Sequence, residues 1–309
     1  MINKKYPQYS AKGSISRNVL QQIKRKVGGI VLQKIGTAVL TSVDNIVISA
    51  FLGLSILTIY NNYIFVLTAL CSFLNVILLS IIPSIGNSVV VESKEKNYRD
   101  FQKFNFLYIF VISWASTCLF VLYQPFMKLW MGNKLGSSSM LGNDIVVLLC
   151  VYFFVLKLGD IAHAYNEACG IWEKRKLINI IASLLNLILN ISLVKQIGLY
   201  GILISTIVSV VFVSIPADSY VLFKYYFNDT DKWKHFMGKQ FSHFVIAGIG
   251  TCIINMICSF ELKNCFADLF VKACMAGGLG FVFYVAMYYR STQFKECCKF
   301  IKYSLIRGK

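Results

Sequence analysis

The sequence predicts an all-α membrane protein, a bundle of about eight transmembrane helices. Of its 309 residues, 57% are hydrophobic and only 15% are charged, whereas a soluble domain carries about 25% charged residues. The mean hydropathy of +0.63 agrees with a chain that lies in lipid. Eight apolar runs are long enough to cross a bilayer core of about 30 Å as helices. These runs use more than half of the chain and leave no room for a soluble domain longer than a short loop.

The apolar runs also divide the chain into segments. The predicted spans lie near residues 28–52, 56–82, 105–130, 143–165, 177–195, 198–223, 240–260 and 266–289. The predicted segments are a basic cytoplasmic segment (1–27), a six-helix lobe (28–223), a cytoplasmic loop (224–239), two additional transmembrane helices (240–289) and a basic cytoplasmic tail (290–309).

The first segment is polar and contains seven Lys and Arg residues but no acidic residue. A secretory signal peptide places its apolar region soon after a short basic start and ends at a cleavage site flanked by small residues. Here the first apolar run begins near residue 28 and continues without such a site. We therefore expect a cytoplasmic segment that leads into a retained span.

The positions of the basic residues predict the orientation of the bundle. If the N-terminus is inside, the inner segments hold 24 Lys and Arg residues and the outer segments hold four. This excess predicts that both termini are cytoplasmic. Orientation alone thus accounts for most of the net charge of +17, and we expect the lipid bilayer rather than a nucleic acid as the partner of this chain.

Motifs of metal and nucleotide chemistry are missing from the sequence. The three histidines are dispersed, and no His-Glu-x-x-His or paired Cys-x-x-Cys spacing occurs. No phosphate-binding loop or dinucleotide fingerprint is present either. We expect no metal, no cofactor and no enzymatic activity.

The first span carries polar residues on one face. Placed at 100° per residue, Lys34, Thr37, Thr41, Asp44 and Asn45 fall on one side of the helix. An ionised residue in mid-bilayer costs from ~2.5 kcal/mol upward, so such a face is a candidate for lining a substrate cavity. The alternative is that the lysine snorkels to the inner surface while the aspartate and asparagine approach the outer one.

A second intramembrane group lies in the fourth span. Lys157 and Asp160 are spaced i, i+3 on one face, and His163 and Glu167 continue toward the cytoplasm. Because Lys157 lies at a depth comparable with that of Lys34, the two lysines could meet an anion that enters from the inner leaflet. The alternative is a purely structural Lys157–Asp160 pair.

Asp218 follows Pro216 in the sixth span. Proline frees a carbonyl and permits a kink, so this pair is a candidate hinge or proton site. Alternatively, the carboxylate lies close enough to the inner end to reach water.

Several short motifs carry a resemblance to a known family. They are Lys5-Tyr6-Pro7, Gln21-Gln22-Ile23-Lys24-Arg25-Lys26, Lys34-Ile35-Gly36, Ser42-Val43-Asp44-Asn45-Ile46-Val47-Ile48-Ser49, Lys128-Leu129-Trp130-Met131-Gly132 and Gly198-Leu199-Tyr200-Gly201-Ile202. In these motifs and their spacing the chain resembles polysaccharide flippases of the Wzx type. These flippases belong to the exporter superfamily that includes the drug-extruding MATE proteins and the peptidoglycan lipid flippase.

The resemblance implies a MATE-like C-terminal lobe followed by two extra helices, with the N-terminal lobe lacking. It also implies export of undecaprenyl-diphosphate-linked oligosaccharide across the bacterial plasma membrane. The partners would be this lipid-linked oligosaccharide and a second chain that supplies the missing lobe. Lys34 and Lys157 would then offset the diphosphate charge, while Thr37, Thr41 and Asn45 would line the path of the sugar.

Three alternatives stay open. A drug or cation exporter of the same superfamily predicts a cavity dominated by acids, whereas Lys34 and Lys157 balance Asp44 and Asp160 here. A membrane-embedded enzyme of glycan assembly predicts a large outer loop, whereas the longest outer segment, about residues 125–143, is short. A truncated, inactive gene fragment is the third.

Overall fold

The computed structural model describes residues 15–132 and 140–307, and these residues confirm the predicted all-α class. They contain helices and turns but no strand. Eight of the helical stretches are long and apolar enough to cross a membrane. The membrane-spanning character predicted from the sequence is therefore present in the fold.

Among the described residues, five helices and one π-helical turn build the first four spans, and a short sixth helix begins the fifth. They are α2 (Arg17–Phe51), α3 (Leu54–Val91), α4 (Lys94–Met127) with the π-helical turn η1 (Lys128–Gly132), α6 (Asn143–Leu158), α7 (Asp160–Ala168) and the short α8 (Trp172–Arg175), which leads into the fifth span. The later spans are formed by α9 (Ile178–Ile197), by α10 (Leu199–Ser209), η3 (Val210–Ser214), α11 (Ile215–Leu222) and η4 (Phe223–Phe227) in series, by α12 (Thr230–Ile257) and by α13 (Cys265–Tyr288). A last helix, α14 (Thr292–Arg307), follows them.

Several helices extend beyond the predicted spans. Helix α2 begins at Arg17, where the Ser16 hydroxyl accepts from the Val19 amide, and α4 begins at Lys94 with Ser93 in the same capping role. Apolar runs mark only the part of a helix that crosses the lipid core, whereas backbone hydrogen bonding continues into the polar region until a cap ends it. The tail predicted at 290–309 likewise contains α14.

The predicted cytoplasmic loop at 224–239 is largely helical. The π-helical turn η4 reaches Phe227 and α12 starts at Thr230, so only Asn228 and Asp229 connect them. Asn228 adopts a left-handed conformation with φ 55°, which ends one helix, and the Asp229 carboxylate accepts from two amides of the next. The lysines of this segment therefore project from helices.

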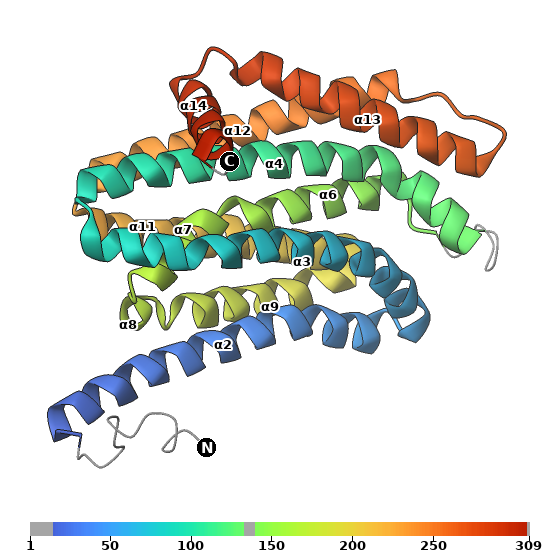
Figure 1. Cartoon of the computed structure of the whole chain (residues 1–309). Helices are drawn as coiled ribbons and strands as arrows, with labels where there is room; N and C mark the ends of the chain where they lie inside the picture. Colours follow the sequence, from blue (N-terminus) through green and yellow to red (C-terminus); the bar gives the residue numbers. More distant parts are fainter. Residues whose placement is uncertain (1–14, 133–139, 308–309) are drawn as a thin grey trace, which may run out of the picture.

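The bundle is organised around α4, which packs against α6 on one side and against α12 and α13 on the other (Figure 1). At the opposite edge, α2 packs mainly on α9, and α9 packs on α10. The approach of α2 to α9 is close at Gly36, where an added Cβ would lie 2.9 Å from the Cβ of Asn179. The first span is thus attached to the bundle chiefly through the fifth.

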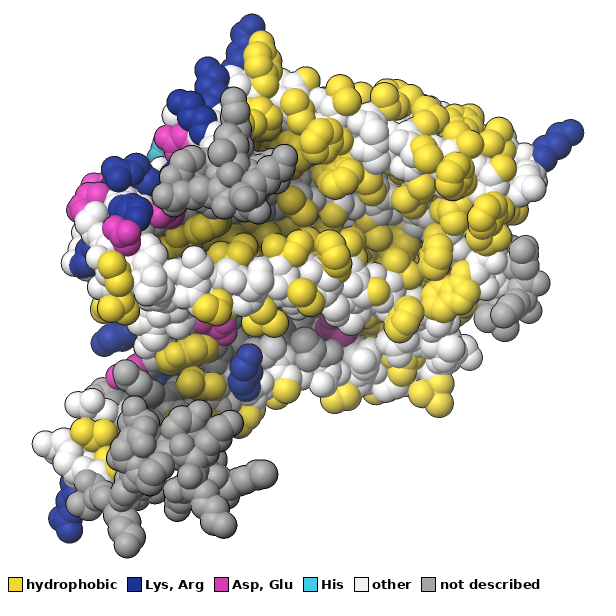
Figure 2. All heavy atoms as spheres, viewed as in Figure 1, with side chains coloured by type: hydrophobic (Ala, Val, Ile, Leu, Met, Phe, Trp, Pro, Cys, Tyr) yellow, Lys and Arg dark blue, Asp and Glu magenta, His cyan; other side chains and the backbone are white. Residues whose placement is uncertain are grey.

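Charged side chains gather at one end of the bundle. Figure 2 shows most of the blue and magenta groups at the end where α2 begins, α3 meets α4 and α14 lies, while hydrophobic side chains cover the length of the helices. The connections that the sequence assigns to the cytoplasm therefore share one end of the molecule.

Candidate functional site

Four of the predicted site residues, Asp44, Lys157, Asp160 and Asp218, lie in three polar clusters inside the bundle. The first surrounds Asp218, the second contains Lys157 and Asp160, and the third surrounds Asp44. Each cluster joins at least two spans, because its members come from different helices.

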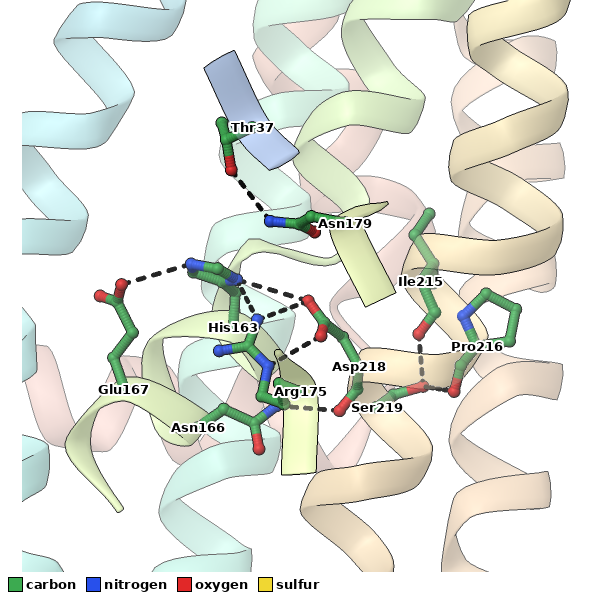
Figure 3. A network of polar contacts seen from close by, with 10 residues as sticks. All are labelled: Thr37, His163, Asn166, Glu167, Arg175, Asn179, Ile215, Pro216, Asp218 and Ser219. Carbon is green, nitrogen blue, oxygen red and sulfur yellow. Dashed lines mark hydrogen bonds and ion pairs between the residues drawn. The ribbon is translucent and has the colours of Figure 1, made fainter. Parts of the chain in front are cut away.

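In the first cluster, Asp218 of α11 binds Arg175 of α8 in a two-pronged ion pair (Figure 3). The Arg175 Nε donates to Asp218 Oδ1 at 2.8 Å, and Nη2 donates to Oδ2 at 2.6 Å. Arg175 is only 1% exposed. A bidentate pair with an arginine is the strong form of a charge-assisted hydrogen bond, so the carboxylate is neutralised within the protein.

Helix α7 extends this network. His163 lies between two carboxylates, with Nδ1 3.4 Å from Asp218 Oδ2 and Nε2 3.4 Å from Glu167 Oε1. The side-chain amide of Asn166 donates to the Asp218 carbonyl at 2.8 Å. The network therefore ties α7, α8 and α11 together.

Pro216 lies in the first turn of α11, directly after the π-helical turn η3. Proline cannot supply an amide to the helix ladder, and a wider π-helical turn is a common way to accommodate an interruption of that ladder. The Ser219 hydroxyl donates to the Ile215 carbonyl at 2.7 Å. The sixth span is therefore irregular next to its carboxylate.

The second cluster holds Lys157 in contacts within the bundle. Its Nζ lies 3.0 Å from Asp160 Oδ2 and donates to Asn75 Oδ1 at 3.0 Å. The Tyr108 hydroxyl donates to the same carboxylate oxygen at 2.7 Å. Lys157 is only 7% exposed. This geometry is that of an internal Lys157–Asp160 pair rather than of a lysine open to an anion from the inner leaflet.

The third cluster differs because its carboxylate faces only neutral groups among the described residues. Asp44 is 5% exposed. Asn190 of α9 donates to its Oδ1 at 2.9 Å, and Thr206 of α10 donates to its Oδ2 at 3.2 Å. Asn186 completes the group by donating to the Thr206 hydroxyl at 2.8 Å. A buried carboxylate that accepts only from neutral amide and hydroxyl groups carries an uncompensated charge, which a proton or a small cation can neutralise.

Three other predicted residues of the first span are exposed. Lys34 and Asn45 are exposed. Thr37 is also exposed, and its hydroxyl accepts from the Asn179 side-chain amide at 2.9 Å (Figure 3). The Thr41 side chain lies outside the part that the structure describes. Lys34 is near enough to Glu167 for an electrostatic interaction, so it belongs beside the Asp218 cluster, whereas Lys157 lies in another.

Several members of these clusters were not predicted as site residues. Arg175 was counted among the basic residues of an inner loop, yet it is buried. Tyr108, Asn186 and Thr206 are ordinary residues of apolar spans until their partners on other helices are known. The i, i+4 spacing of Asn186 and Asn190 in an apolar helix is the one feature that could have indicated a polar face.

Within residues 15–132 and 140–307, no group of three or more His, Cys, Asp and Glu side chains is arranged to hold a metal ion. Comparisons with protein families, curated proteins and solved structures found no match for this chain. The fold and its clusters define a polytopic helical membrane protein with buried polar networks that connect its spans.

Proposed function

We propose that the chain forms part of a transporter that moves an undecaprenyl-diphosphate-linked oligosaccharide across the bacterial plasma membrane. In this proposal it is a MATE-like lobe with two additional helices that works together with a second lobe. Motion between inward-open and outward-open states would carry the head group across, as in other secondary transporters.

The observation that carries the proposal is that Lys34 is exposed and forms no ion pair within the described part of the chain. Three other cations of the spans, Lys157, Arg175 and Lys272, are buried and paired with carboxylates. Lys34 is exposed, and it has no ion pair within 4.0 Å among the described residues. A lipid diphosphate needs a cation at membrane depth to offset its desolvation, and Lys34 is available for that role.

The face around Lys34 also supports a second lobe. Neighbouring helix α3 exposes large apolar side chains along its length, including Phe65, Phe73 and Val76 at 64–66%. On α2, the polar residues Thr37 and Asn45 are exposed as well. A surface of mixed polar and apolar character fits the wall of a path between two lobes better than a face that contacts only lipid.

The experiment is transport of a lipid-diphosphate-linked oligosaccharide in proteoliposomes, read as exposure of the glycan to an external glycosidase. The protein is reconstituted together with whatever second lobe co-purifies with it. We expect Lys34→Ala to lower the flipping rate by about tenfold, the scale for losing one charge-assisted contact to a diphosphate.

Lys24→Ala is the matched control, because Lys24 lies on the same helix near its N-terminal end. It should leave the rate unchanged. Equal rates for Lys34→Ala and the wild type would reject the cavity role of Lys34, and absence of flipping by the wild-type assembly would reject the proposed function.

One feature favours a second candidate, a small-cation exporter of the same superfamily. Asp44 is a buried carboxylate that has no cationic partner among the described residues. An organic cation could satisfy it. In that case Asp44→Asn would abolish export of a fluorescent cationic dye, and Lys34→Ala would not reduce it.

A further inference from the structure

At the end of the bundle opposite the charged one, α4, α12 and α13 enclose a cavity of about 500 Å³. This volume lies within the range of about 300–1,000 Å³ that is usual for small-molecule sites. Four polar side chains line it that have no hydrogen bond or ion pair to any other described residue: Lys128, Asn143, Asn255 and Glu261. They supply an ammonium, a carboxylate and two amides to one space.

The wall of the cavity contains a buried ion pair, in which the charges of a lysine and an aspartate compensate each other. Lys272 Nζ lies 3.0 Å from Asp268 Oδ2, and the two residues are only 7% and 8% exposed. Asp268 Oδ1 also accepts from the Leu262 amide at 3.0 Å. Lys128 is also near enough to Asp268 for an electrostatic interaction, although the direct ion pair of Asp268 is with Lys272. The charged side chains of the lining that have no direct partner among the described residues are therefore Lys128 and Glu261.

The aromatic residues near the cavity lead us to expect it at the depth of lipid head groups. Lys128 is two residues before Trp130, which is 38% exposed and packs against Phe65 and Phe126 with ring centroids 6.0 and 5.7 Å apart. Exposed tryptophan with neighbouring aromatic rings is typical of the boundary between lipid core and water. A membrane lipid can thus bring its head group to this cavity while its acyl chains stay in the bilayer.

We propose that this cavity binds the head group of a zwitterionic phospholipid with a primary ammonium, of the phosphatidylethanolamine type. The phosphate lies against Lys128, and the ammonium donates to Glu261. Asn143 and Asn255 offer amide groups that can bond to either end. An anionic lipid would leave Glu261 unpaired beside its phosphate, and a quaternary ammonium has no N–H to donate to Glu261. The site is separate from Lys34 and does not depend on the transported substrate.

The test is lipid retention by the full chain, measured by native mass spectrometry after exposure to equimolar phosphatidylethanolamine, phosphatidylglycerol and phosphatidylcholine. We expect phosphatidylethanolamine to be retained preferentially. Lys128→Ala and Glu261→Gln should each lower that retention by about tenfold, the scale for losing one charge-assisted hydrogen bond. Both side chains are exposed, so the variants should keep the melting temperature of the wild type.

Lys263→Ala is the matched control, because Lys263 is exposed in the same connection and does not line the cavity. Equal retention of phosphatidylglycerol, or retention that neither variant changes, would overturn the proposal. Soluble glycerophosphoethanolamine separates a lipid from a free zwitterion. It should fail to displace the lipid at an equimolar amount, and equal displacement would overturn the assignment to a lipid.

Discussion

Arg175 and Asp218 form a buried ion pair, and the stability of the bundle depends on the presence of both residues. The guanidinium is fully buried and reaches the carboxylate of another helix through two hydrogen bonds. Removing one partner of a buried ion pair leaves the other charge without compensation, whereas removing both replaces a polar contact with an apolar one. The pair therefore stabilises the packing of α7, α8 and α11 only while it is complete.

We expect Arg175→Ala to lower the free energy of unfolding by about 3–5 kcal/mol, because the buried Asp218 loses both hydrogen bonds from the guanidinium. Thermal unfolding in detergent measures the effect. Lys176→Ala, at the exposed neighbouring position, should change little. The double variant Arg175→Met, Asp218→Leu should be more stable than Arg175→Ala alone, and the opposite order would show that the ion pair is not the cause.

Asp44 leads to a prediction about how transport is coupled to an ion gradient. If its carboxylate exchanges a proton or a small cation during transport, Asp44→Asn removes the charge that changes and keeps the size of the side chain. Flux in proteoliposomes should then stop responding to an imposed proton or sodium gradient. Ser42→Ala, at an exposed position of the same helix, should keep the response. A variant at Asp44 that still follows the gradient would assign the carboxylate a structural role.

The sequence predicts contacts between residues of one helix and misses contacts between residues of different helices. The Lys157–Asp160 pair is visible because both residues are on one helix at i, i+3. The partners of Asp218 and Asp44 lie on other helices, 43 and 146 residues away along the chain. Periodicity within one helix carries no information about such pairs.

Helix α2 is attached to the bundle through a close contact with α9. It meets α9 at Gly36, where a Cβ would lie 2.9 Å from the Cβ of Asn179 and 3.1 Å from its carbonyl carbon. The backbone of α9 cannot move aside as the end of a flexible side chain can. The close approach of the first and fifth spans therefore depends on the absence of a side chain at this position.

Two glycines of α2 should respond to alanine with opposite signs. Gly36→Ala should destabilise the protein by about 1–3 kcal/mol, because the added methyl overlaps α9. Gly28→Ala should stabilise it by about 0.5–1 kcal/mol, because a Cβ there meets nothing within 4 Å and alanine favours the helix. Thermal unfolding of both variants tests this, and a destabilising Gly28→Ala would show that helix propensity is not the deciding factor.

The apolar runs predict which segments form membrane-spanning helices, but they do not predict the residues at which these helices begin and end. All eight spans were anticipated, yet α2 starts eleven residues earlier than the predicted 28, at Arg17. The lipid core selects for apolar residues only across its thickness. Where a helix ends beyond that core depends on caps such as Ser16 and Asp229.

For the whole molecule, the gathering of charge at one end predicts its orientation in the membrane. The basic connections lie together at that end (Figure 2), and an excess of Lys and Arg marks the cytoplasmic side. We expect green fluorescent protein fused after Lys309 to fluoresce in cells. Alkaline phosphatase inserted after Glu261, in the connection between α12 and α13, should be active.

The reciprocal fusions are the control. Alkaline phosphatase after Lys309 should be inactive, and green fluorescent protein after Glu261 should be dark. Activity of alkaline phosphatase at the C-terminus would place that terminus outside and reverse the positions of Lys34 and the head-group cavity relative to the two leaflets.

The Arg175–Asp218 pair also constrains how the chain enters the bilayer during synthesis. Arg175 leaves the ribosome 43 residues before its partner. It lies in the first turns of the fifth span, and without that partner a buried guanidinium is an uncompensated charge. The guanidinium must therefore remain near water, or inside the insertion machinery, until the sixth span arrives. We expect the fourth, fifth and sixth spans to leave the translocon as a group, with the pairing of these two charges as the step that releases them.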